Sequence, residues 1–86
     1  MRIELFYIPG SQKCANARGG LRAAAEEVNP GVIWRELDAL DEIDYAVEIG
    51  VTTLPAIAID REVAFSSLPT PRQLREALRR RATGTG

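Results

Sequence analysis

The stretch Pro9-Gly10-Ser11-Gln12-Lys13-Cys14 (PGSQKC) separates two segments with different hydrophobic patterns. Before it, the run IELFYI from Ile3 to Ile8 predicts a short β-strand that is buried on both faces. After it, apolar residues recur at spacings of three and four from Gln12 to Val28, which predicts a helix with one buried stripe. The chain's single cysteine, Cys14, is therefore expected in the first turn of a helix that Ser11 can cap.

A second strand is expected after this helix. Asn29-Pro30-Gly31 is a turn sequence, and Val32 to Asp38 (VIWRELD) predicts a strand at a partly solvated edge of the sheet. Because a helix of this length between two strands acts as a crossover, the two strands are expected to pair in parallel. Gly19 and Gly20 lie in the middle of the helix, where each glycine costs about 1 kcal/mol relative to alanine. This cost predicts that another backbone passes close to them.

A short second helix is expected after the second strand. Asp41 can cap it, and Gly50 is expected to end it. Its inward side is predicted to hold the apolar residues Ile43, Ala46 and Val47. Four acidic residues lie near its start: Asp38, Asp41, Glu42 and Asp44. The segment that contains them lacks the glycine and the distal glutamate of a calcium loop. We therefore interpret them as acidic side chains that stabilise the N-terminus of a helix.

A β-hairpin and a last helix are expected in the remaining sequence. Ala56 to Ile59 and Val63 to Ser66 are the two predicted strands of the hairpin. Thr70 is expected to cap the last helix and Pro71 to begin it. The inner side of this helix is predicted to hold Leu74, Ala77 and Leu78, and the outer side Arg75, Arg79, Arg80 and Arg81. We interpret the arginine run as the solvated end of a helix, where cations complement the dipole, and not as a nucleic-acid patch.

Length and composition limit the classes of function. The 86 residues predict one domain over 1–82, followed by a flexible tail over 83–86. A net charge of −1 gives no general attraction to nucleic acid or to a membrane surface, and no signal peptide or membrane span is predicted. With one cysteine and no histidine, neither an internal disulfide nor a zinc or haem site is expected. We therefore expect a cytoplasmic, monomeric protein without a metal or another cofactor.

The predicted order of elements, β-α-β-α-β-β-α, resembles the short form of the thioredoxin fold, an α/β fold in which three helices flank a four-stranded mixed sheet. The segments PGSQKC and GVTTLPAIAID are similar to those of small thioredoxin-like and glutaredoxin-like proteins, which have Pro-Gly, Cys-x-x-Cys and later Gly-Val-x-x-x-Pro-Ala before a strand. The resemblance covers the chain to about Arg81. It implies a thiol–disulfide oxidoreductase that transfers electrons between protein or peptide thiols and disulfides, with a reductase as a further partner.

The resemblance places Ser11 at the position of the family's nucleophilic cysteine and Cys14 at the resolving position. A thiolate attacks the substrate disulfide, and the partial positive charge of a helix N-terminus favours that anion. A serine hydroxyl has no comparable thiolate and cannot hold a disulfide, so the chain is expected to be inactive in dithiol exchange. The resemblance also implies a cis peptide bond before Pro55, with Thr53 and Leu54 as contacts for an extended substrate peptide.

Three origins of Ser11 are open. It can be an engineered substitution in an otherwise conventional oxidoreductase, made to prevent oxidation or dimerisation. It can also be a natural residue of a redox-inert binding or scaffold domain, or a hydroxyl that hydrogen-bonds the thiolate of bound glutathione, as in glutathione transferases. The first is preferred because the rest of the motif is intact. As a plain N-cap, Ser11 would contribute about 1 kcal/mol over alanine, and as a plain apolar residue Cys14 would be a small buried side chain.

Besides Ser11, one position and one short segment depart from the family pattern. Typical thioredoxins bury a carboxylate six residues before the first motif position, where this chain has Leu5, so acid–base assistance has to come from elsewhere. Glutaredoxins hold glutathione with a Gly-Gly-x-Asp stretch after the hairpin, where this chain reads Phe65-Ser66-Ser67-Leu68. Glutathione binding is therefore not expected, although Ser66, Ser67 and Thr70 near a helix N-terminus could still receive a carboxylate.

Overall fold

The computed structural model describes residues 1–83 and contains helices and strands in the expected order. They are β1 (Arg2–Tyr7), α1 (Gln12–Val28), β2 (Ile33–Asp38), α2 (Ile43–Ile49), β3 (Ala56–Ile59), β4 (Glu62–Phe65) and α3 (Pro71–Thr83). The expected bounds of α1 and β3 are confirmed, whereas β1, β2 and β4 differ from the expected bounds by one residue. Residues 84–86 of the predicted tail lie outside the described residues.

The four strands form one mixed sheet in the order β2-β1-β3-β4. β1 pairs in parallel with β2, as the crossover through α1 requires, and antiparallel with β3, which in turn forms the predicted hairpin with β4. This topology is that of the thioredoxin fold expected from the sequence. In the register between β1 and β3, Phe6 lies opposite Ala56, so the end of β1 and the start of β3 meet at one end of the sheet.

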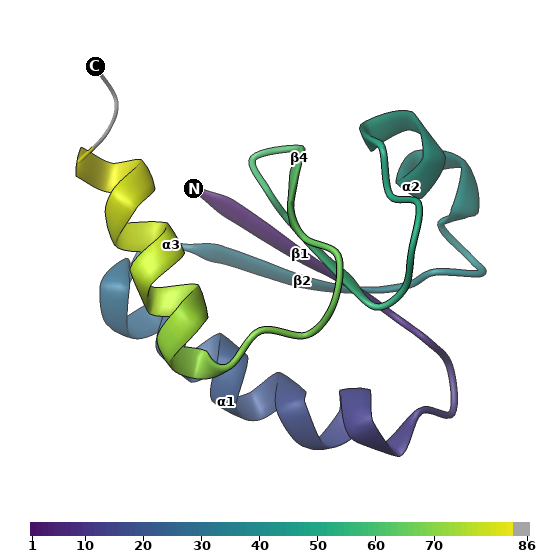
Figure 1. The fold of residues 1–86 in the computed structure, drawn as a ribbon, viewed down its shortest axis with the longest axis horizontal. Coiled ribbons are helices and arrows are strands. Elements are labelled where there is room, and N and C mark those ends of the chain that lie inside the picture. The colour runs from purple at the N-terminus through teal and green to yellow at the C-terminus, as the bar shows by residue number, and fades with distance from the viewer. Residues whose placement is uncertain (84–86) are drawn as a thin grey trace.

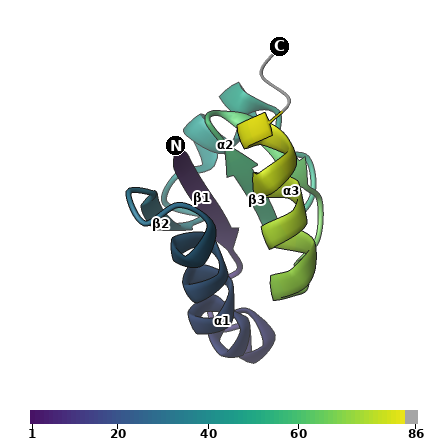
Figure 2. The same ribbon diagram turned by 90° about the vertical axis from the view of Figure 1, so that its left-hand side faces the viewer.

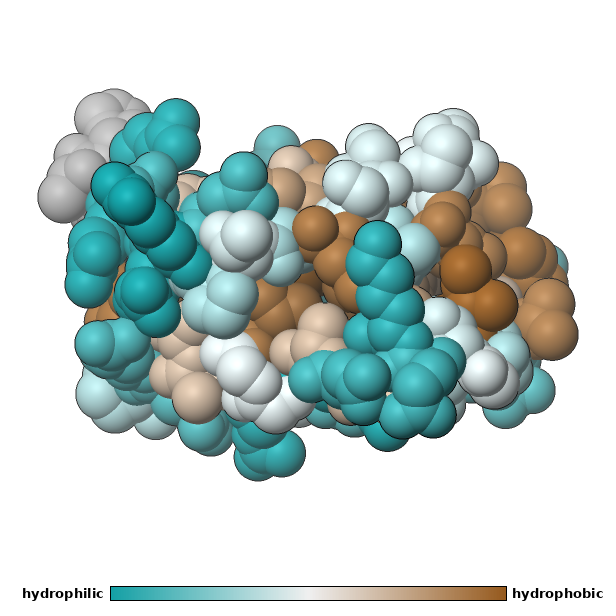
Figure 3. Space-filling model, turned by 60° about the horizontal axis from the view of Figure 1, so that its bottom comes forward, coloured by the Kyte–Doolittle hydropathy of each residue, from teal (hydrophilic) through white to brown (hydrophobic). Residues whose placement is uncertain are grey.

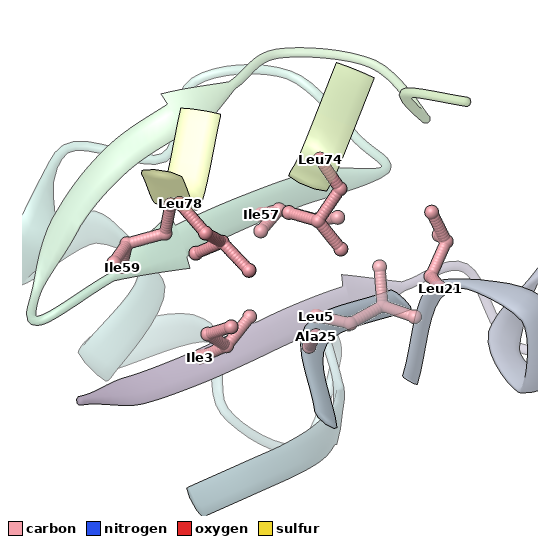
Figure 4. Close-up of a cluster of buried hydrophobic side chains, with 8 residues drawn as sticks. All are labelled: Ile3, Leu5, Leu21, Ala25, Ile57, Ile59, Leu74 and Leu78. Atoms are coloured by element: carbon pink, nitrogen blue, oxygen red, sulfur yellow. The ribbon is translucent and has the colours of Figure 1, made fainter. Parts of the chain in front are cut away.

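Helices cover both faces of the sheet (Figures 1 and 2). α1 and α3 pack together on one face, where Ile3 and Leu5 of β1 meet Leu21 of α1 and Leu74 of α3 in the larger core (Figure 4). α2 covers the other face over a smaller core that contains Phe6, Leu37, Ala46 and Ala58. Since residues 3–6 are all buried and side chains alternate along a strand, the expectation that β1 is buried on both faces is confirmed.

The start of α2 differs from the expectation, although its end does not. Glu42 is the N-cap and makes no side-chain hydrogen bond, so Asp41 does not cap this helix. The carboxylate of Asp38 instead accepts the N–H groups of Leu40 at 2.8 Å and Asp41 at 3.4 Å, in a turn that precedes the helix. Gly50 ends α2 in the left-handed conformation, with φ of 95°, as predicted.

The buried side of α2 was also only partly predicted. Ala46 is buried as expected, but the side chains of Ile43 and Val47 are 49% and 65% exposed, so their predicted inward position is wrong. Tyr45 and Ile49 pack against the smaller core instead. Both pairs have the helical spacing of four residues, and the sequence pattern of so short a helix does not decide between them.

The prediction of a close backbone at the glycines of α1 is wrong. A Cβ at Gly19 would meet nothing within 4 Å, and a Cβ at Gly20 would meet the side chain of Pro71 at 3.7 Å, which is an ordinary contact. Both glycines are exposed. They therefore weaken the helix without a compensating close approach to another backbone.

The start of α3 confirms the predicted cap. Thr70 Oγ1 accepts the backbone N–H of Gln73 at 3.1 Å, and the side-chain oxygen of Gln73 accepts the backbone N–H of Thr70 at 2.9 Å. This reciprocal pair is a capping box, which satisfies two backbone donors that the helix cannot. Leu74 and Leu78 are buried and Ala77 is half-buried, so the predicted inner face of α3 is also found.

Candidate functional site

Ser11 and Cys14 lie at the start of α1, directly after the loop that follows β1. Ser11 is the N-cap, and its Oγ accepts the backbone N–H of Cys14 at 3.4 Å. The side chain of Cys14 is 2% exposed, and its thiol forms no disulfide. Residues three apart on a helix have neighbouring side chains, so positions 11 and 14 can place two reactive groups within reach of each other.

A cavity of about 180 Å³ opens beside these two residues. Its walls come from the end of β1, the loop before α1 and the first two turns of α1, and they consist of Tyr7, Ile8, Gly10, Ser11, Gln12, Cys14, Ala15 and Arg18. Arg18 is the one permanently charged side chain among these residues, and no carboxylate is present. The buried thiol thus borders an open space that has a cationic wall.

Two contacts hold Arg18 at the wall of this cavity. Its guanidinium carbon lies over the ring of Tyr7, 5.4 Å from the centroid, and its Nη1 donates to Oε1 of Glu36 at 3.2 Å. The indole N–H of Trp34 donates to the other oxygen of Glu36 at 2.8 Å and so fixes that carboxylate. The sequence predicts that Arg18 lies on the polar face of α1 but does not predict its place at the cavity wall. Its partners Tyr7 and Glu36 lie on β1 and β2, so the helical pattern of α1 carries no signal of them.

The loop before β3 holds the other predicted site residues. The Leu54–Pro55 peptide bond is cis, as expected. The hydroxyl of Thr53 donates to the carbonyl of Ser66 at 3.0 Å, which joins this loop to the segment after β4. The register between β1 and β3 puts the loop at the same end of the sheet as the loop before α1. Thr53, Leu54 and Pro55 do not line the cavity beside Cys14.

Exposed apolar side chains gather at the end of the molecule where α1 begins. Figure 3 shows hydrophobic residues at its right-hand end, and Figure 1 places the loop before α1, the connection from β2 to α2, and α2 itself at that end. The exposed large apolar side chains of these segments are Ile8, Leu40, Ile43 and Val47. Such a surface is of the kind that contacts another protein.

The structure contains a buried carboxylate that the sequence did not single out. Glu4 of β1 is fully buried; its Oε1 accepts the hydroxyl of Tyr45 at 2.5 Å, and its Oε2 accepts Nη1 of Arg35 at 3.0 Å. Burial raises the pKa of the Tyr45 phenol, and the hydrogen bond and negative charge of Glu4 raise that pKa further. Glu4 does not line the cavity, and alternation along β1 turns it to the face opposite Leu5. It therefore does not replace the carboxylate that is missing at Leu5.

Neither a metal site nor a membrane-spanning helix is found within residues 1–83. No three or more His, Cys, Asp or Glu side chains of this part of the chain are placed to hold a metal ion. None of the helices described there is both long enough and apolar enough to cross a membrane.

The sequence and the fold were compared with those of known proteins. A thioredoxin of Methanocaldococcus jannaschii is 30% identical over 81 residues, which are 94% of this chain and 95% of that protein. A probable thioredoxin of Methanothermobacter thermautotrophicus is 30% identical over 78 residues, which are 91% of this chain and 92% of that protein. A solved structure of a malarial protein shares the fold with a TM-score of 0.72 at 12% identity, over 92% of this chain and 93% of that chain. No protein-family model matches the sequence.

Proposed function

This chain belongs to the thioredoxin family and is a redox protein of thioredoxin type, and we propose that it is a thiol–disulfide oxidoreductase in which Ser11 occupies the position of the nucleophilic cysteine. The observation that supports this most is the place of Cys14, a buried free thiol in the first turn of α1 that borders a cavity. A sulfur at position 11 would stand at the N-cap, three residues before Cys14, as dithiol exchange requires.

Dithiol exchange needs two sulfurs that act in turn. The thiolate at the first position attacks one sulfur of the substrate disulfide, and the other substrate sulfur leaves as a thiolate. The second thiol then attacks the resulting mixed disulfide, closes an intramolecular disulfide and releases the reduced substrate. Ser11 removes the first step because its hydroxyl provides no thiolate at neutral pH. Cys14 remains as the only thiol, and the chain with Ser11 is inactive in this cycle.

Protein or peptide disulfides are the proposed substrates. The loop with Thr53 and Leu54 lies at the same end of the sheet as the start of α1, where its backbone can pair with an extended segment as an added strand. Ile8 and Leu54, one in each loop, are exposed apolar side chains that suit contact with a protein surface. A cytoplasmic reductase would then return the oxidised dithiol to its reduced form.

The proposal is tested by the variant Ser11→Cys in the reduction of insulin disulfides by dithiothreitol. The variant is expected to accelerate the reaction well above the rate with the original chain, because it supplies the missing nucleophile. Ser67→Cys is the matched control, since it adds a thiol in the exposed segment between β4 and α3. Equal rates for Ser11→Cys and Ser67→Cys would contradict the proposal.

A redox-inert binding or scaffold domain is the second candidate. It is favoured by the hydrogen bond from the Cys14 N–H to Ser11 Oγ, which gives the serine a structural role as the N-cap of α1. In this case Cys14 contributes only packing, and Cys14→Ala would leave the capture of a protein partner unchanged. Loss of capture in Cys14→Ala would count against this candidate.

A further inference from the structure

Arg18 stands four residues after Cys14 on α1, and both residues line the same cavity of about 180 Å³. We propose that Arg18 is a specificity-determining residue, and that the site prefers disulfides that carry a carboxylate close to the attacked sulfur. The inference deepens the function proposed above, on which it rests, because it names the class of disulfide that the site takes.

The guanidinium of Arg18 is held in place before any substrate arrives. Its guanidinium carbon lies over the ring of Tyr7, and one of its N–H groups donates to Glu36. Arginine has five N–H donors in a rigid plane, so a guanidinium with one donor used can still pair with an incoming carboxylate. Because Tyr7 and Glu36 already restrict the side chain, little conformational entropy remains to be lost when it binds an anion.

The charges around the cavity favour an anion. Arg18 is the permanent charge among the lining residues, and the carboxylate that pairs with it, Glu36, lies on β2 outside the lining. The side chains of Arg18 and Glu36 are 36% and 28% exposed, so water screens the interaction and the expected preference is modest. A volume of 180 Å³ corresponds to about six water molecules, which is room for a small acidic group and not for a folded segment.

The preference can be measured on Cys14 itself, without a complete redox cycle. The Cys14 thiolate attacks one sulfur of a disulfide reagent, its S–S bond breaks, and one half leaves as a thiolate while the other half stays bound to Cys14. The thiol loses its proton to solvent, and the reagent is the oxidant. The two probes are dithiobis(nitrobenzoate), which carries carboxylates, and dithiodipyridine, which is uncharged.

The measured quantity is the ratio of the two second-order rate constants, acidic reagent over neutral reagent. Arg18→Gln is expected to lower this ratio about five-fold, the size of a partly screened ion pair. Arg22→Gln is the matched control, because it removes the same charge from an exposed position of the same helix that does not line the cavity. Glu36→Gln is expected to raise the ratio, since it removes the carboxylate that competes for Arg18.

An unchanged ratio in Arg18→Gln, or an equal fall in Arg22→Gln, would overturn the inference. So would a Cys14 that reacts with neither reagent in the folded chain. Two acidic disulfides, each reduced by Ser11→Cys, show which kind of molecule supplies the carboxylate. One is oxidised glutathione, and the other is a disulfide-linked peptide dimer with glutamate beside its cysteine. Adding Arg18→Gln should slow the reduction of the preferred disulfide, and no slowing of either would contradict the proposal. If the reagent ratio responds as expected but Ser11→Cys fails to reduce insulin, the proposed function fails and the anion preference of the cavity stands.

Discussion

Tyr45→Phe should cost more stability than the loss of a hydroxyl from a half-exposed side chain normally does. The phenol donates to Oε1 of Glu4 at 2.5 Å, and Glu4 is fully buried. The substitution keeps the ring, whose centroid lies 5.9 Å from that of Phe6, and removes only the donor. In this variant Glu4 keeps its ion pairs with Arg35 at 3.0 Å and with Arg2 at 3.9 Å, but Oε1 of Glu4 loses the hydrogen bond from the phenol.

The expected magnitude follows from the kind of hydrogen bond that is lost. A hydrogen bond to a charged group contributes about 1.5–3 kcal/mol to stability. Because Arg35 and Arg2 still neutralise Glu4, the lower part of that range applies, and we expect a loss of about 2 kcal/mol. For a domain of this size, 1 kcal/mol shifts the melting temperature by about 4–8 °C, so Tyr45→Phe should lower it by about 8–16 °C.

Urea unfolding followed by circular dichroism at neutral pH measures this loss. Tyr7→Phe is the matched control, because within residues 1–83 the hydroxyl of Tyr7 makes no hydrogen bond and its ring can stay under Arg18. Its effect should be below about 0.5 kcal/mol. A double-mutant cycle with Glu4→Gln should give a clear coupling energy with Tyr45→Phe. Equal losses for Tyr45→Phe and Tyr7→Phe would refute the account of the buried carboxylate.

Three further predictions concern stability. Gly19→Ala should raise the free energy of unfolding in urea by about 0.5–1 kcal/mol, because alanine favours the helix and the added Cβ meets nothing within 4 Å; a loss of stability would mean that the space is not open. Thr70→Ala should lower it by about 1 kcal/mol and Thr70→Ser much less, since the hydroxyl caps the N–H of Gln73; equal losses in both would contradict this. The raised pKa of Tyr45 means that the folded chain keeps the phenol proton to higher pH than the unfolded chain. The contribution of the protonated phenol to the free energy of unfolding is therefore complete below a pH of about 10 and is lost as pH rises through the folded pKa. Unfolding measured across that range should show a decline that is weaker in Tyr45→Phe, and identical declines would argue against the shift.

The parts of the fold that the sequence predicts are those decided by strong local signals. Seventeen residues of helical periodicity between Ser11 and Asn29 predict α1 with its bounds, and the length of this helix requires parallel pairing of β1 and β2. Thr70 and Pro71 predict the start of α3 by their known preferences for the first helical positions. The family resemblance adds the cis bond before Pro55, which no local signal in the chain would have shown.

The parts that were missed depend on contacts between elements distant in the sequence. Glu4 looks like an interruption of an apolar strand, and its burial is stabilised by Tyr45 and Arg35, which lie 41 and 31 residues further along the chain. The buried side of α2 is chosen by packing against the smaller core and not by its own short pattern. Arg18 reaches the cavity wall because β1 and β2 offer Tyr7 and Glu36 beside α1, and these pairings appear only in three dimensions.

Positions 11 and 14 are proposed to be the two halves of a dithiol site, and disulfide formation in Ser11→Cys measures whether their sulfurs can join. After oxidation with oxidised dithiothreitol, mass spectrometry of the intact protein should find a monomer that has lost two hydrogen atoms, with no thiol left to alkylate. The sulfur at the N-cap and the sulfur of Cys14 would then be joined, as their spacing in the first turn of α1 allows. A monomer that keeps two alkylatable thiols, or a disulfide-linked dimer of Ser11→Cys in place of the oxidised monomer, would show that positions 11 and 14 are not paired in this way.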